Sequence, residues 1–199
     1  MTSHKIAVKF FVEDPAFPAG SELVPVFHSW IQSHAVADHL PIDVADYQHV
    51  KEGPGTLLIT HEANFALDRE GGRPGLLYVR KQPITDADTF ADRLRAILRA
   101  TLEAAARIEQ DPRTADHAKF RTDEFLFRIY DRLLGPNEPA TFAAVKADLE
   151  SVVSELYGNP PRALEFTPDP QSLFEVLVKT GSSPSVETLL SRLSPATSR

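Results

Sequence analysis

The order of the expected strands and helices is the same in the two halves of this 199-residue chain. A strand, a turn and a helix are expected at 76–94 and again at 175–193, and a shift of 99 residues aligns these segments without a gap. At the front of each half, Val8–Phe11 is similar to Phe127–Tyr130, with a shift of 119 residues. Such a repeat restricts the fold, since both copies must form the same unit. The aligned positions at the first shift are Val79 and Val178, Arg80 and Lys179, Asp88 and Glu187, Thr89 and Thr188, Phe90 and Leu189, Arg93 and Arg192, and Leu94 and Leu193.

The repeat predicts an α+β fold made of two ferredoxin-like β-α-β-β-α halves. Their antiparallel or mixed sheet would be covered by helices on one face, which leaves the other face for water, a partner sheet or a ligand. We expect the halves at 1–110 and 120–199, joined by a linker at 111–119 and packed as one compact unit. The first half would read β-α-β-β-β-α, because it carries a His/Asp-rich insertion at 37–68. Identities between the halves are few, so chance similarity is the alternative.

Helical periodicity is clearest between residues 86 and 109. The apolar side chains of this segment fall on one stripe, and Thr85 followed by Asp88 resembles a capping box with Asp in place of Glu. A second clear helix is expected at 139–157. The remaining expected elements are strands at 5–12, 41–47, 56–61, 65–68, 76–80, 163–167 and 173–179, and helices at 23–35 and 184–193.

The segment 124–131 fits two structures. Phe125 and Phe127 alternate with other residues as in a strand, whereas Phe127, Tyr130 and Leu134 also have the spacing of a helix. Periodicity alone does not decide between them. The repeat favours the strand, because it aligns this segment with the first strand of the chain.

The composition excludes several classes of function. The chain has no cysteine, so it has no disulfide framework, no thiolate metal site and no thiol nucleophile. Its formal net charge is −7 and its pI is near 5.5, which makes nucleic acid and anionic membranes unfavourable partners. No apolar run reaches the roughly 18 residues of a membrane span, and the N-terminus lacks the apolar core of a signal peptide. We therefore expect a cytoplasmic protein that does not contact membranes.

Strand alternation predicts a basic and aromatic surface on the uncovered face of the sheet. If Val8 and Phe10 face the helices, then Lys9 and Phe11 face away. The same reasoning, with the apolar members of each later strand placed inward, puts basic and aromatic residues of these strands on the uncovered face. The predicted ligand-binding residues are Lys9, Tyr78, Arg80, Arg128, Tyr130 and Lys179, and Glu175 is the one acid expected among them.

Such a surface suits a small anionic ligand with an aromatic part. Single-stranded nucleic acid uses similar stacking and phosphate contacts, but the net charge and the lack of a Gly-Phe motif of the RNP type argue against it as a partner. Two further interpretations are open: long basic side chains cover exposed apolar surface, or two such sheets pack together in a dimer. We expect a homo-oligomer, with a homodimer as its simplest form. The leading hypothesis is a module that binds a small anionic ligand or a partner.

Six of the seven histidines lie at or before position 61, among several aspartates. Histidine and carboxylate groups are ligands for zinc, manganese and iron, which makes a metal-assisted hydrolase built on 37–68 the alternative hypothesis. The spacings do not form a recognised metal-binding motif, so we predict neither a metal site nor a cofactor. The catalytic candidates are His61, Glu62 and Asn64, where a histidine beside a carboxylate could act as a general base. Whether the protein is an enzyme is left open.

Overall fold

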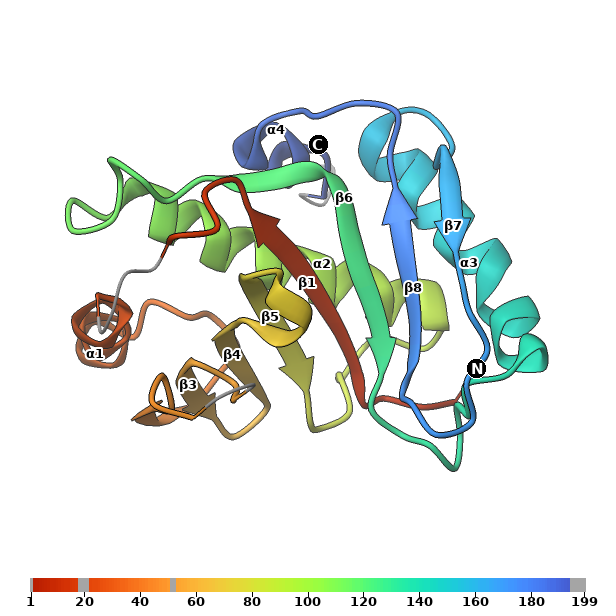
Figure 1. Ribbon diagram of the computed structural model, residues 1–199, viewed down its shortest axis with the longest axis horizontal. Coiled ribbons are helices and arrows are strands. Elements are labelled where there is room, and N and C mark those ends of the chain that lie inside the picture. Colours follow the sequence, from red (N-terminus) through yellow and green to blue (C-terminus); the bar gives the residue numbers. More distant parts are fainter. Residues whose placement is uncertain (1, 18–21, 51–52, 194–199) are drawn as a thin grey trace.

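The computed structural model describes residues 2–17, 22–50 and 53–193 (Figure 1). Within these ranges the strands form one eight-stranded antiparallel sheet in the order β2-β3-β4-β5-β1-β6-β8-β7. Strand β1, the first in sequence, therefore lies in the middle of the sheet. The elements in chain order are β1 (Ile6–Val12), α1 (Leu23–Ser33), β2 (Pro41–Asp46), β3 (Thr56–Thr60), β4 (Ala63–Asp68), the 3-10 turn η1 (Glu70–Gly72), β5 (Gly75–Arg80), α2 (Phe90–Gln110), β6 (Phe120–Ile129), α3 (Pro139–Tyr157), β7 (Ala163–Glu165), β8 (Phe174–Lys179) and α4 (Val186–Leu193).

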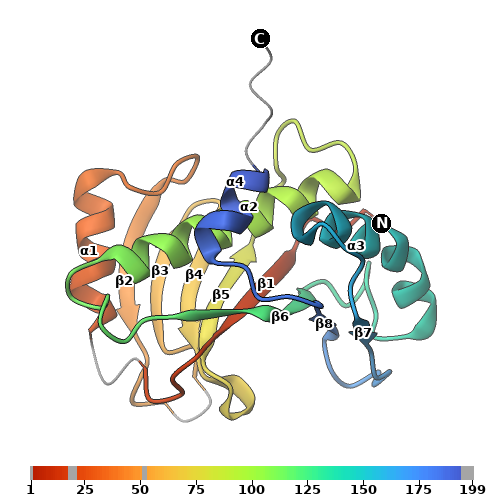
Figure 2. The same cartoon turned by 90° about the horizontal axis from the view of Figure 1, so that it is seen from above.

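The α-helices of the described chain all lie on one face of the sheet (Figure 2). Helix α2 packs on β1 and β5 with α3 and α4 beside it, and α1 packs on β2 and β3. One hydrophobic core, from Ile6 to Leu193, fills the space between the helices and the sheet. The expected α+β class is confirmed, and the sheet is antiparallel. None of the described helices is long and apolar enough to cross a membrane.

The segment that fitted both a strand and a helix is part of strand β6. Phe125 and Phe127 are fully buried toward the helices, and β6 pairs with β1 on one side and β8 on the other. The strand begins at Phe120, four residues before the segment in question. Pairing with β1 and β8, which are distant in sequence, therefore determines that this segment is a strand, which local periodicity could not distinguish from a helix.

The segment expected as a linker, 111–119, packs against the rest of the molecule. The Arg113 guanidinium donates hydrogen bonds to the carbonyl oxygen of Pro25 and to Ser29 Oγ, both in α1. Thr114 is fully buried, and its hydroxyl donates to the carbonyl oxygen of Ile108. These contacts tie the end of α2 to α1.

The first half has the five strands that were expected before the long helix, one more than the order β-α-β-β-β-α contains. The expected strands 56–61 and 65–68 are β3 and β4, which pair with each other across a tight turn at His61 and Glu62. With β1, β2 and β5 this gives five strands before α2.

The first turn of α2 is closed by a capping box. The helix begins four residues later than expected, and its capping box uses Thr89 and Asp92 instead of Thr85 and Asp88. Thr89 Oγ1 accepts a hydrogen bond from the Asp92 N–H at 3.1 Å, and the Asp92 carboxylate accepts one from the Thr89 N–H at 3.2 Å.

We expect Thr89→Ala to lower the free energy of unfolding by about 1 kcal/mol, because it leaves a backbone donor of the first turn without its cap. Thr85→Ala is the matched control and should change stability by less than about 0.5 kcal/mol. Urea denaturation of both variants checks this. If Thr85→Ala lowered the free energy of unfolding as much as Thr89→Ala or more, the observed start of α2 would be contradicted.

Candidate functional site

The face of the sheet opposite the helices, called the open face here, is defined by strand register. Lys9 on β1 lies opposite Leu77 on one side and Leu126 on the other, and Ala7 lies opposite Val79 and Arg128. Residues opposite each other across an antiparallel pair share a face. On the central strands the open face therefore carries Ala7, Lys9, Phe11, Leu77, Val79, Leu126 and Arg128.

Two of the predicted open-face residues, Tyr78 and Arg80, point to the other side of the sheet. Tyr78 lies opposite Val8, and it belongs to the core under the helices, where it is 1% exposed. The alternation of residues along β5 gave the wrong side for Tyr78 and Arg80, because both faces of this strand are apolar. Leu77 packs into a small cluster with Ala7 and Ala66 on the open face, so the apolar character of Leu77 did not mark the inner side.

On the helix side, Tyr78 and Arg80 form a buried polar chain with His39. His39 Nε2 lies 2.9 Å from Tyr78 Oη, and Arg80 donates to Tyr78 Oη and to the carbonyl oxygens of Gln82 and Pro83. Burial lowers the pKa of His39 and raises the pKa of Tyr78. All three Arg80 nitrogens thus have protein partners, which gives this arginine a role in holding the turn after β5.

The β4–β5 connection, residues 69–74, folds over the open face. In Figure 2 this loop projects from the side of the sheet away from the helices, as does the β7–β8 loop. The Arg73 guanidinium lies 3.7 Å from the centre of the Phe11 ring and forms an ion pair with Glu124. Glu70 reaches Arg128 with a distance of 2.6 Å between Oε2 and a guanidinium nitrogen. Two ion pairs and a cation–π contact therefore hold the loop against β1 and β6.

A hollow of about 420 Å³ lies on the open face between these two loops. Its floor is made by side chains of β1, β6 and β8, and its walls come from the β4–β5 loop and the start of β8. Its volume falls in the range of small-molecule sites. The lining residues are Lys9, Phe11, Glu70, Gly71, Arg73, Leu126, Arg128, Ser172, Leu173, Glu175 and Leu177. A second hollow of about 340 Å³ adjoins it toward β7 and shares Leu126, Ser172, Glu175 and Leu177.

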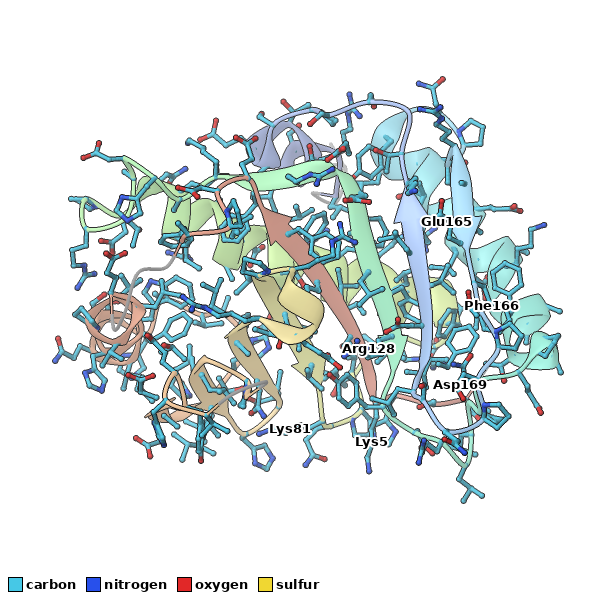
Figure 3. All side chains as sticks on the ribbon, in the orientation of Figure 1. Lys5, Lys81, Arg128, Glu165, Phe166 and Asp169 are labelled. Atoms are coloured by element: carbon cyan, nitrogen blue, oxygen red, sulfur yellow. The ribbon has the colours of Figure 1, made fainter. Side chains whose placement is uncertain are left out.

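Arg128 is one of three cations that line the hollow, with Lys9 and Arg73, and Figure 3 labels its position in the sheet. Its guanidinium binds Glu70, binds Glu175 at 2.8 Å and donates to Tyr130 Oη at 3.3 Å. Burial alone would lower the pKa of Arg128, but its hydrogen bonds to Glu70 and Tyr130 raise the pKa above the usual range of arginine. Arg128 is therefore a permanent positive charge.

The open face carries more acids than the single Glu175 that the sequence predicted. Lys9 is paired with Asp68, Arg73 with Glu124, and Lys179 with Glu165 at 2.6 Å. Glu165 and Lys179 lie at the β7 edge of the sheet, away from the β4–β5 loop (Figure 3). The expected basic surface is instead a set of ion pairs. Alternation along β6 could have placed Glu124, whereas Asp68 and Glu165 lie at strand ends and Glu70 in a loop, where alternation gives no guide.

Lys9 and Asp68 form the most deeply buried of these ion pairs. Lys9 Nζ lies 2.5 Å from Asp68 Oδ2, and the two side chains are 3% and 6% exposed. Asp68 Oδ1 also accepts the N–H of Glu70 at 3.0 Å, so this carboxylate fixes the start of the β4–β5 loop. Burial lowers the pKa of Lys9, although the charge of Asp68 opposes that effect.

The three catalytic candidates do not come together. His61 is exposed in the β3–β4 turn, and the Glu62 carboxylate accepts the N–H of Leu40 at 2.8 Å. Partial burial would raise the pKa of Glu62, but this hydrogen bond and nearby His39 lower the pKa overall. Asn64 lies on β4 opposite Val79, which places it on the open face. Within the described ranges no hydrogen bond or ion pair joins these three side chains.

The His/Asp-rich segment shows no metal site in the part of the chain that the structure describes. There, no three His, Asp or Glu side chains form a group that could hold a metal ion. The metal-assisted hydrolase therefore stays a prediction from the sequence.

Two residues that line the hollow, Glu70 and Arg73, and the ion-pair partner of Arg73, Glu124, were outside the predicted set. Glu124 has the same strand parity as Arg128, so alternation along β6 was sufficient to find it. Glu70 and Arg73 lie in a loop next to two glycines, and only the folded position of that loop brings them to β1 and β6. Comparisons of this chain with protein-family models, with curated proteins and with solved structures found no match.

Proposed function

We propose that this protein binds a small anionic ligand in the hollow of the open face, with Arg128 as the main contact for the negative charge. One observation carries the proposal. The Arg128 side chain is 10% exposed, whereas the carboxylates that neutralise it, Glu70 and Glu175, are 53% and 47% exposed. A fixed, buried cation is thus held by acids that can turn toward solvent, which is what an anion needs in order to replace one of them.

Glu70 is the carboxylate that a ligand would displace. It is followed by Gly71 and Gly72, which have φ angles of 66° and 68° and no atom within 4 Å of where a Cβ would lie. Glycine adopts such angles without strain, and the tip of this loop has no packing to lose. The Glu70 side chain can therefore turn toward solvent without strain in the loop, and a ligand carboxylate or phosphate would replace it in a charge-assisted hydrogen bond to Arg128.

The rest of the hollow suits the organic part of such a ligand. Phe11, Leu126 and Leu177 contribute apolar surface around the Lys9–Arg128 floor. Sites for small molecules usually combine apolar walls with a few polar groups that set the orientation. We therefore propose a small organic anion with an apolar or aromatic part.

We also propose that the two halves are ferredoxin-like duplicates. What supports this is the strand order outward from the centre, which is β1, β5, β4 on one side and β6, β8, β7 on the other. Each of these sets occurs in the chain as strand, helix, two strands and helix, once β2 and β3 are set aside as an insertion. In this interpretation, β1 and β6 each complete the sheet of the other half.

Ligand binding by variants tests the proposed function. A thermal-shift screen with small carboxylates and phosphates would identify a binder, and calorimetry would then give its Kd. We expect Glu70→Gln to tighten binding, because it removes the competing charge. We expect Arg128→Ala to weaken it by roughly tenfold to a hundredfold, the loss of one hydrogen-bonded charge contact.

Lys179→Ala is the matched control, since Lys179 is a paired cation on the same face but does not line the hollow. Its Kd should equal that of the wild-type protein. Equal affinities for the wild-type protein, Glu70→Gln and Arg128→Ala would refute an anion site at Arg128.

A further inference from the structure

Lys9 combines burial with an incomplete set of hydrogen bonds. A lysine ammonium has three N–H donors. In the described structure, Lys9 Nζ donates to Asp68 Oδ2 and makes no other hydrogen bond, although its side chain is 3% exposed. The centre of the Phe11 ring also lies 5.6 Å from Nζ. Burial therefore destabilises the ammonium, and within the described residues Asp68 offsets this effect through one hydrogen bond.

Burial is the main effect that favours loss of the Lys9 proton. It lowers the pKa of Lys9, and the positive charge of Arg128 adds to this effect, whereas the charge and hydrogen bond of Asp68 and the charge of Glu70 oppose it. Lysines that lie in apolar surroundings near another cation are activated as nucleophiles. Asp68, at 2.5 Å, is placed to accept the proton.

Lys9 and Arg128 lie close enough to act on one small molecule. Lys9 faces Leu126 across the β1–β6 pair, and Arg128 is two residues further along β6 on the same face. Such diagonal neighbours are roughly 7–8 Å apart. Both residues line the same hollow, so an acid group held by Arg128 would leave the adjoining part of the molecule beside Lys9.

We propose that Lys9 forms an imine with an oxo acid bound in the hollow. This inference rests on the proposed function, because Arg128 would hold the acid group. Asp68 takes a proton from the Lys9 ammonium, and the freed amine forms a bond to the carbonyl carbon of the ligand. A proton then moves from the nitrogen of the adduct to its oxygen, and the proton held by Asp68 is transferred to the resulting hydroxyl, which leaves as water while the C=N bond forms. The reaction converts one lysine ammonium and one carbonyl to a protonated imine and one water, and needs no oxidant or reductant.

Reductive trapping on the wild-type chain tests this. The protein would be incubated with pyruvate and cyanoborohydride, and the reduced adduct would be located by peptide mass spectrometry. We expect labelling at Lys9 to be at least tenfold faster than at any other lysine. Lys9→Arg should abolish the label at that peptide, and Lys81→Arg should leave the Lys9 label unchanged. Lys81 is the matched control because its ammonium also has a protein acceptor, the carbonyl oxygen of Thr60, but it does not line the hollow.

A second arm separates this inference from the proposed function. Arg128→Ala should slow labelling by pyruvate but not labelling by acetone, which has no acid group. Slow, unselective labelling in a protein that still binds anions through Arg128 would overturn the imine and leave the proposed function standing. Selective labelling of Lys9 that is the same in the wild-type protein and Arg128→Ala would overturn the oxo acid as the substrate class. Absence of both anion binding and labelling would overturn both proposals.

Discussion

Asp68→Ala is expected to lower the free energy of unfolding by about 3–5 kcal/mol, because it removes the only hydrogen-bond partner that the buried Lys9 has among the described residues. The substitution also removes the acceptor for the Glu70 N–H at the start of the β4–β5 loop. Breaking a buried ion pair on one side is costly, since the remaining charge cannot reach water. Chemical denaturation of the variant at neutral pH measures the loss.

Two controls show whether burial is the cause. The double variant Lys9→Met with Asp68→Leu should recover most of the loss, because apolar residues of similar size often replace a buried ion pair without penalty. Glu165→Ala removes a carboxylate from a half-exposed pair with Lys179 and should cost at most about 1 kcal/mol. If Asp68→Ala cost no more than Glu165→Ala, the Lys9–Asp68 pair would not be buried as described.

Phe127→Ala is expected to cost about 3–5 kcal/mol of unfolding free energy, since it removes a large, fully buried ring from the core. The centre of the Phe127 ring is 5.9 Å from that of Phe90 in α2 and 6.4 Å from that of Phe174 in β8. Its loss would therefore loosen the packing between the sheet and α2 as well as that between β6 and β8.

Leu126, the residue before Phe127, is the control that distinguishes a strand from a helix in this segment. Leu126 lies on the open face and is half-buried, so Leu126→Ala should cost about 1 kcal/mol or less. A helix over this segment would place Leu126 and Phe127 on the same apolar stripe, and both substitutions would then lower the free energy of unfolding by a large amount. Equal, large losses of unfolding free energy for the two variants would contradict the strand.

The long helices were predictable from the sequence, because their apolar residues repeat with the helical period over several turns. The predicted segment 139–157 has the same bounds as α3, and α2 ends one residue after the predicted end at 109. The start of α2 was placed four residues too early. Both Thr85 and Thr89 have an Asp three residues later, and only the folded chain shows which pair caps the helix.

The side of the sheet to which each side chain points was predictable only for strands that have one apolar and one polar face. In β1, Lys9 interrupts the apolar residues and marks the open face. In β5, Leu76 to Val79 are apolar at every position, and pairing with β1 decides which of them face the helices. This is why Lys9, Arg128 and Lys179 were placed correctly on the open face while Tyr78 and Arg80 were not.

The position of β1 has a consequence for how the chain folds. This strand is synthesised before the other described strands, yet it lies in the middle of the sheet, where its neighbours are β5 and the much later β6, so that Ile6 pairs with Ile129. Until β6 has been made, one edge of an almost entirely apolar strand has no partner, and exposed apolar strands are prone to aggregate during synthesis. The one charged residue within β1 is Lys9. A charged side chain within an apolar strand opposes its pairing with other chains, so we expect Lys9 to limit aggregation of the unfinished sheet.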